Sequence, residues 1–136
     1  MLKLLRIDNA RMNVPEPEYF TAGGAIKIGD LCKIENGKIM YAYSEADLKE
    51  FVALSDAKDG DTVAVCRLTN NQVWEAAWRN DIGTAQLANG ASVNFSSNEI
   101  TGEGDEAVIV DTNGAKGEGD TVYVRFRCLY RRTTTE

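Results

Sequence analysis

Short apolar-alternating runs separated by turn residues dominate the chain from residue 25 onward. Such runs, bounded by Gly, Asn and Asp, are typical of β-strands rather than of amphipathic helices. Their regular spacing favours a small barrel or sandwich over a layout of alternating strands and helices. We therefore predict an all-β fold, a small β-barrel or β-tulip-like domain, with strands at 25–28, 31–34, 39–43, 51–54, 62–68, 73–78, 82–87, 92–96, 107–110 and 121–130.

Two turns in this pattern predict hairpins. Asn36-Gly37 stands between two apolar runs, and both residues tolerate the positive φ that a two-residue hairpin requires. Asn70-Asn71 predicts a second hairpin between 62–68 and 73–78. Ser44 to Asp47 has the spacing of a helix capping box, so at most one short helix is expected, at 45–50.

Residues 1–24 differ from the rest of the chain. Pro15 and Pro17 interrupt the segment and a Gly23-Gly24 joint follows it, so we predict an extended N-terminal arm before a barrel at 25–130, with a fraying tail at 131–136. An arm of this kind either folds back as an edge strand or reaches out to another molecule. The candidate partner-binding residues of the arm are Leu2, Leu4, Leu5, Ile7, Met12 and Val14.

A short internal echo accompanies the strand pattern. Residues 57–65 resemble residues 115–124, and Gly29 to Cys32 is a weaker third copy. We interpret this as one local solution used repeatedly, in which Gly-Asp forms a tight turn and a β-branched run enters the barrel.

The charge of −6 is distributed unevenly over 136 residues. Residues 45–120 contain 15 acidic and 5 basic side chains, a net of −10, whereas the two ends contain 6 acidic and 10 basic side chains, a net of +4. An acidic chain argues against nucleic acid as a partner. The one basic cluster lies at the end of the last predicted strand, where Arg125 and Arg127 are further candidates for partner binding, beside Arg131 and Arg132. Alternatively, this cluster is a solvated strand end.

Catalytic motifs are not found. The chain has no histidine, which excludes Ser-His-Asp and Cys-His arrangements, and Cys32, Cys66 and Cys128 form no CxxC pair. The carboxylates concentrate in turns, where solvated surface is the ordinary role. We expect no enzyme activity, no metal site and no cofactor. No apolar run has membrane-spanning length and no signal peptide is recognised, so neither membrane insertion nor secretion is expected.

Trp74 and Trp78 are the largest apolar side chains and share one face of the predicted strand at 73–78. Two interpretations compete for them. In one they are part of the core; in the other they form an exposed stacking platform that binds a glycan or another small ligand.

Three segments carry a resemblance: AGGAIKIGDLCKIENGKI at 22–39, FVALSDAKDGDTVAV at 51–65 and GDTVYVRF at 119–126. Together they resemble the small capsid decoration (cement, or head-stabilising) proteins of tailed bacteriophages and prophages. The similarity lies in the repeated pattern of Gly-Asp turn, strand and Asn-Gly return, and not in a catalytic signature.

This resemblance implies a β-barrel or β-tulip body that binds the outer surface of a phage head lattice and stabilises it without catalysis. It also implies an N-terminal arm that lies on the shell, the major capsid protein as partner, and a homo-oligomer, with a trimer favoured. The implied location is the virion surface after synthesis in the bacterial host cytoplasm. The alternative function is a small β-barrel binding module that uses the exposed tryptophan pair.

Overall fold

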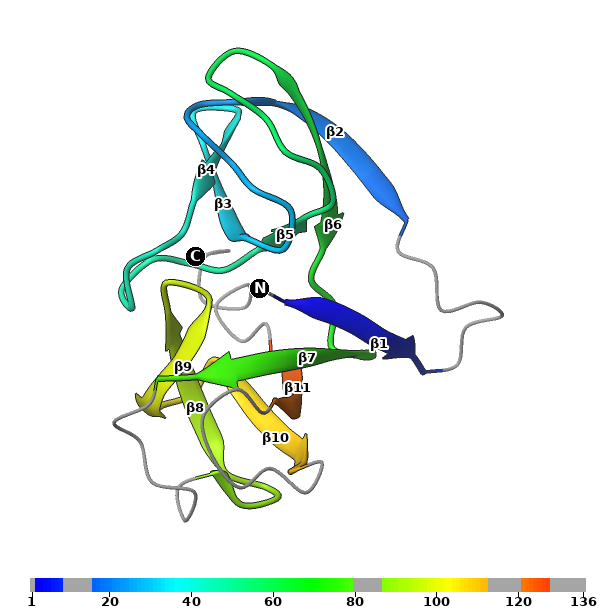
Figure 1. The fold of residues 1–136 in the computed structure, drawn as a ribbon, viewed down its shortest axis with the longest axis vertical. Coiled ribbons are helices and arrows are strands. Elements are labelled where there is room, and N and C mark those ends of the chain that lie inside the picture. Colours follow the sequence, from blue (N-terminus) through cyan, green and yellow to red (C-terminus); the bar gives the residue numbers. More distant parts are fainter. Residues whose placement is uncertain (1, 9–15, 80–86, 113–120, 128–136) are drawn as a thin grey trace, which may run out of the picture.

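The computed structural model describes residues 2–8, 16–79, 87–112 and 121–127. Every element among these residues long enough to be named is a β-strand, so the predicted all-β class is confirmed (Figure 1). The strands are β1 (Lys3–Ile7), β2 (Pro17–Ala22), β3 (Leu31–Glu35), β4 (Lys38–Tyr41), β5 (Phe51–Ala53), β6 (Thr62–Arg67), β7 (Gln72–Trp78), β8 (Ser92–Ser96), β9 (Glu99–Glu103), β10 (Ala107–Asp111) and β11 (Val122–Phe126).

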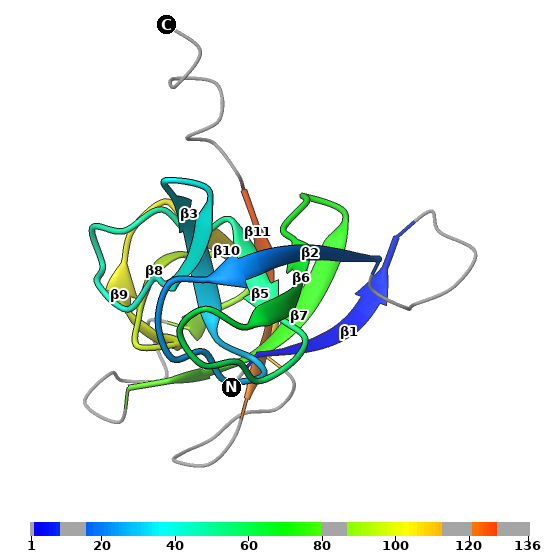
Figure 2. The same ribbon diagram turned by 90° about the horizontal axis from the view of Figure 1, so that it is seen from above.

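The strands form two lobes, one above the other in Figure 1. The barrel lobe is a closed five-stranded barrel in the order β2-β4-β3-β5-β6. The sheet lobe has the order β1-β7-β11-β10-β8-β9, and an additional β7–β9 pairing closes its last five strands into a ring. β1 lies outside that ring, on an edge of β7, and Figure 2 shows it at the periphery of the molecule.

The Asn36-Gly37 hairpin is confirmed. Glu35 pairs with Lys38 across the turn, and the two turn residues have φ values of 52° and 78°. Both lie in the left-handed region, which matches the twist of the flanking strands and which Asn and Gly adopt at little cost.

The barrel lobe contains a local repeat with an offset of 31 residues. Phe20 pairs with Val63 and Thr21 with Thr62, while Phe51 pairs with Cys32 and Val52 with Leu31 in the same relation. The two halves meet at a reciprocal bridge, where the backbone N–H groups of Ile26 and Ala57 each donate to the other's carbonyl at 2.9 Å. Of the predicted echo, the copies near residues 30 and 60 are therefore the equivalent pair. The copy at residues 115–124 lies mostly outside the described residues.

Two local predictions are wrong. Residues 45–50 contain a turn at 45–46 and no helix. The Asp47 carboxylate accepts from Ser44 N–H at 3.2 Å and the Ser44 hydroxyl accepts from Ala46 N–H at 3.3 Å, which stabilises the turn. β6 and β7 do not form a hairpin, since β6 pairs with β2 and β5 whereas β7 pairs with β1, β9 and β11. The turn at residues 69–72 instead carries the chain from one lobe to the other.

The remaining strand predictions differ mainly at their ends. The predicted strand at 25–28 is reduced to the single bridge at Ile26, and the region after residue 96 contains β9, which the sequence pattern did not predict. The predicted strand at 82–87 falls, except for Leu87, outside the described residues, as do residues 128–130 of the last strand.

The predicted boundary at residue 24 does not separate an arm from the barrel. β1 belongs to the sheet lobe and β2 is a strand of the barrel, so this segment folds back onto the molecule. The fraying predicted at 131–136 falls outside the described residues.

One apolar core joins the lobes and a second fills the barrel. The larger cluster combines sheet-lobe residues such as Trp74 and Phe95 with Leu31, Val52 and Cys66 from the barrel. The smaller cluster includes Phe20, Phe51 and Val63, with the Phe20 and Phe51 rings edge-to-face at 5.5 Å. Because the larger core crosses the junction, the two lobes constitute one folding unit.

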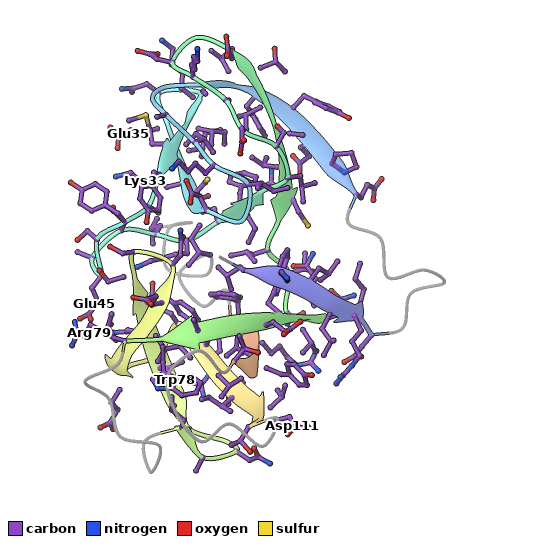
Figure 3. The ribbon with its side chains drawn as sticks, viewed as in Figure 1. Lys33, Glu35, Glu45, Trp78, Arg79 and Asp111 are labelled. Carbon is purple, nitrogen blue, oxygen red and sulfur yellow. The ribbon has the colours of Figure 1, made fainter. Side chains whose placement is uncertain are left out.

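Polar contacts also connect the lobes. Lys49, 3% exposed, forms an ion pair with Glu106 at 2.9 Å and donates to the carbonyl of Ser44 at 2.9 Å. The carboxylate of Glu45, which Figure 3 shows near Arg79, accepts from the Thr101 hydroxyl at 2.8 Å. The Lys49–Glu106 and Glu45–Thr101 contacts link the 44–50 loop of the barrel lobe to the sheet lobe, and the Lys49–Ser44 bond lies within that loop.

Candidate partner-binding face

β1 occupies one half of an edge of β7. Its residues Lys3 to Ile7 run antiparallel to Gln72–Glu75, with a register shift at Leu5, while β9 pairs with the rest of the same edge, at Ala77 and Trp78. The closed ring therefore exists without β1, which is added to it as a sixth strand.

The predicted partner-binding apolar residues of this segment are largely used inside the molecule. Leu2 is 3% exposed, and Leu4 packs against the same core. Leu5 and Ile7 are half-buried. The structure thus corrects the expectation that these side chains are available to a partner. Met12 and Val14 lie outside the described residues.

Asp8 fastens the end of β1 to the sheet lobe. Its carboxylate accepts from the Arg125 guanidinium at 2.6 Å and from Arg6 Nε at 3.0 Å. Its backbone N–H donates to the Asn71 carbonyl at 2.8 Å, and its carbonyl accepts from the Asn71 side-chain amide at 3.2 Å. The hydrogen bonds from Arg125 and then from Arg6 lower the pKa of the Asp8 carboxyl below 3.8.

Arg125 therefore holds the end of β1 against the sheet lobe through Asp8, in addition to being a surface cation. Besides the Asp8 contact, its Nη1 donates to the Asn70 carbonyl at 3.0 Å. Arg127 is less engaged, with Nη2 donating to the Ser92 hydroxyl at 2.6 Å. Arg125 is paired with a carboxylate, whereas Arg127 contacts a neutral hydroxyl. Of the two arginines predicted to bind a partner, Arg127 is therefore the one whose positive charge is less compensated within the molecule.

Cations from both ends of the chain meet on the outer side of β1, β7 and β11, which we call the terminal-strand face. β1 and β11 both pair with β7, and side chains alternate across a strand, so Lys3 and Glu75 lie on the side opposite Trp74. The same alternation places Arg125 and Arg127 on that outer side, because Val124 and Phe126 are buried in the core. Among the described residues, this face carries four cations, Lys3, Arg6, Arg125 and Arg127, beside three anions, Asp8, Glu75 and, opposite Tyr123 at the β10 edge, Asp111, so it is net basic by one charge on an acidic chain.

The tryptophan pair is not an exposed platform. Trp74 is 1% exposed and Trp78 is 8% exposed, and both belong to the larger core. Figure 3 shows Trp78 at the end of β7. Trp74 and Trp78 lie on the same side of β7, as the sequence predicts, but that side faces the core. The ligand-binding role predicted for Trp74 and Trp78 is therefore corrected to core packing.

Gln72 explains how an indole N–H is accommodated in this core. The Trp74 indole N–H donates to the Gln72 carbonyl oxygen at 3.2 Å, and the same oxygen accepts from Thr69 N–H at 3.1 Å. The Gln72 amide nitrogen donates to the Arg67 carbonyl at 3.0 Å. The buried Gln72 side chain therefore stabilises the turn that connects the two lobes and also satisfies the indole N–H of Trp74.

The described cysteines are buried and protonated. Burial raises the pKa of Cys32 to about 12 and also raises the pKa of Cys66. Within the described ranges, no group of three or more His, Cys, Asp or Glu side chains is arranged to hold a metal ion.

Comparison with known proteins gives no match: neither a protein-family model nor a curated protein is similar to this chain. No helix in the described part of the chain is long and apolar enough to cross a membrane.

Sequence reasoning missed Gln72, Lys49 and Asn98, all of which act at the lobe junction. Asn98 had a usable signal, because Ser-Asn after a strand is a possible two-residue turn. Gln72 and Lys49 had none, since their burial depends on strands distant in the sequence.

Proposed function

We propose that this chain is a structural, non-catalytic protein that attaches to the outer surface of a phage head lattice and stabilises it, with the major capsid protein as partner. The observation that carries the attachment role is the terminal-strand face. β1 and β11 gather Lys3, Arg6, Arg125 and Arg127 on one side of a chain whose central region has a net charge of −10. The capsid as partner follows from the resemblance of residues 22–39, 51–65 and 119–126 to decoration proteins.

Such a face suits an acidic partner surface. The cations on β1 and β11 accelerate the approach of the protein to a negatively charged lattice. Their attraction is screened over about 10 Å at 0.1 M salt. Repeated placement on a lattice then adds stability by mass action and avidity, with no chemical step. The proposal includes self-association, with a homotrimer favoured, and localisation at the virion surface after synthesis in the host cytoplasm.

Co-sedimentation with purified procapsids and mature capsids tests this proposal. We expect the wild-type protein to pellet with capsids. The double variant Lys3→Glu/Arg127→Glu should bind at least about tenfold more weakly at 0.1 M salt, because it removes two cations and adds two anions on the terminal-strand face. The matched control is Lys27→Glu/Lys38→Glu, which changes the net charge equally at exposed positions of the barrel lobe.

Equal loss of binding in both double variants would show a general charge effect and contradict the assigned face. Absence of the wild-type protein from every capsid pellet would overturn the proposed partner. Circular dichroism checks that both variants fold. Light scattering tests the trimer separately, and a monomer at high micromolar concentration counts against it.

A further inference from the structure

Two turns of the barrel lobe have the same sequence form, Lys-x-Gly-Asp, and the same internal hydrogen bonds. In the first turn, Lys27–Asp30, the Asp30 carboxylate accepts from Lys27 N–H at 2.9 Å and Gly29 has φ 87°. In the second, Lys58–Asp61, the Asp61 carboxylate accepts from Lys58 N–H at 3.2 Å and Gly60 has φ 90°. Each closes with an N–H from its Asp to the carbonyl of its Lys at 3.0 Å.

The backbone after each turn is oriented alike. Ala53 N–H donates to the Asp30 carbonyl at 2.9 Å, and Ala22 N–H donates to the Asp61 carbonyl at 2.8 Å. In two antiparallel strands, hydrogen-bonded and non-hydrogen-bonded residue pairs alternate. The residue pair that follows each of these bonds is therefore a non-hydrogen-bonded pair. The N–H groups of Leu31 and Thr62 therefore both point away from the strand that they oppose.

The Lys27–Asp30 turn binds the tip of the β8–β9 hairpin. The β8–β9 turn, Ser97-Asn98, has φ values of 51° and 65°, and the Asn98 amide reaches the first turn with both of its ends. Its oxygen accepts from Leu31 N–H at 2.7 Å, and its nitrogen donates to the second carboxylate oxygen of Asp30 at 2.9 Å. The turn thus presents one donor and one acceptor that match a side-chain amide.

The second turn presents the same pair of groups to solvent. Residues 58–62 are exposed, and Figure 1 shows the β5–β6 loop at the end of the barrel away from the sheet lobe. In the part of the chain that the structure describes, the second carboxylate oxygen of Asp61 accepts no hydrogen bond from the protein, and Thr62 N–H, which points away from β2, donates none outside the strand pairing. Asp61 and Thr62 stand where Asp30 and Leu31 stand in the occupied copy.

We propose that the Lys58–Thr62 turn is a second docking site for a β-hairpin tip, supplied by a partner protein that carries Asn at the second position of a two-residue turn. The hairpin tips within the described residues do not fit this description. Ser97-Asn98 is already bound at the Lys27–Asp30 turn. In Asn36-Gly37 the asparagine stands at the first of the two turn residues instead of the second.

The differences between the two turns define the partner further. Thr62 and Asp59 replace the buried Leu31 and the half-exposed Ile28, so the second site offers no apolar surface and supports only modest affinity. Its two carboxylates, Asp59 and Asp61, favour a tip with a cation beside the amide. This inference does not depend on the partner being a capsid protein.

The test uses a cyclic peptide of residues 93–103, closed by added terminal cysteines and carrying Glu99→Lys to supply the cation. The control peptide adds Asn98→Gly, which keeps the positive-φ turn and removes only the amide. Each is titrated into the ¹⁵N-labelled full chain. We expect saturable shifts of the Thr62 amide resonance with a Kd of about 1 mM, corresponding to weak specific binding. The Leu31 resonance, whose site is occupied, should stay in place.

The control peptide should bind at least about tenfold more weakly. The peptide that retains Asn98 should likewise bind at least about tenfold more weakly to the Asp61→Asn variant, which replaces the outward acceptor by a donor. Equal shifts with both peptides, or no shift of Thr62 at several times the expected Kd, would overturn the proposal. If Asp61→Asn fails to fold, the comparison of the two peptides on the wild-type chain decides.

Discussion

Gln72 acts at the point where the chain passes between lobes, and it is 6% exposed. Replacing it by Leu leaves the buried Trp74 indole N–H and the partly buried Thr69 N–H without their shared acceptor. We expect Gln72→Leu to lower the free energy of unfolding by about 1–3 kcal/mol, measured by urea denaturation. The exposed Lys38→Ala should change it by about 0.5 kcal/mol or less. A Gln72→Leu variant as stable as the wild type would contradict the role assigned to this side chain.

Asp8 makes the attachment of β1 dependent on pH. Because the arginines lower its pKa in the folded state, the ionised carboxylate stabilises the fold above pH 3.8, and this contribution is lost as the pH falls through the lowered pKa. Asp8→Asn removes the charge but leaves the backbone contacts with Asn71. We expect its melting temperature to lie below the wild type at pH 6 and to converge with it as the pH falls through the lowered pKa of Asp8. A difference that is constant with pH would show that the ion pairs do not carry the effect.

At the scale of elements, the Ser97-Asn98 tip both turns a hairpin and joins the lobes. Asn98→Gly keeps the turn and removes the amide bonds to Leu31 and Asp30. We expect it to destabilise the protein by about 1–3 kcal/mol in urea. Asn36→Gly is the matched control, because its turn is of the same kind and its side chain is exposed. If both variants lose the same stability, turn propensity and not docking explains the change.

For the molecule as a whole, β1 decides whether the N-terminal segment is dispensable. The proline-separated pattern predicts that removing residues 1–14 leaves the fold intact, whereas the position of Leu2 in the shared core leads us to expect the opposite. Leu2→Ala should cost about 2–5 kcal/mol, and deletion of residues 1–8 should lower the melting temperature clearly. Leu48→Ala, at a position 41% exposed, is the control. An unchanged melting temperature after the deletion would support the separable arm.

Sequence by itself determined the features that depend on neighbouring residues. Alternating apolar positions defined most strands, and Asn36-Gly37 defined its hairpin because positive φ is a property of the two residues themselves. The Gly-Asp turns at residues 29–30 and 60–61 were visible for the same reason. The absence of histidine, likewise, excluded whole classes of catalytic site without any structure.

Only the tertiary structure decided which strands pair. Val63 and Val73 lie on strands that fit a hairpin equally well by pattern, yet β6 and β7 belong to different lobes, since pairing is set by the core that both faces of a strand must complete. The same reason moved Trp74 and Trp78 from a possible surface to the interior and turned Arg125 into a partner of Asp8. Burial and pairing depend on contacts between distant residues, and a local pattern contains no information on which distant residues will meet.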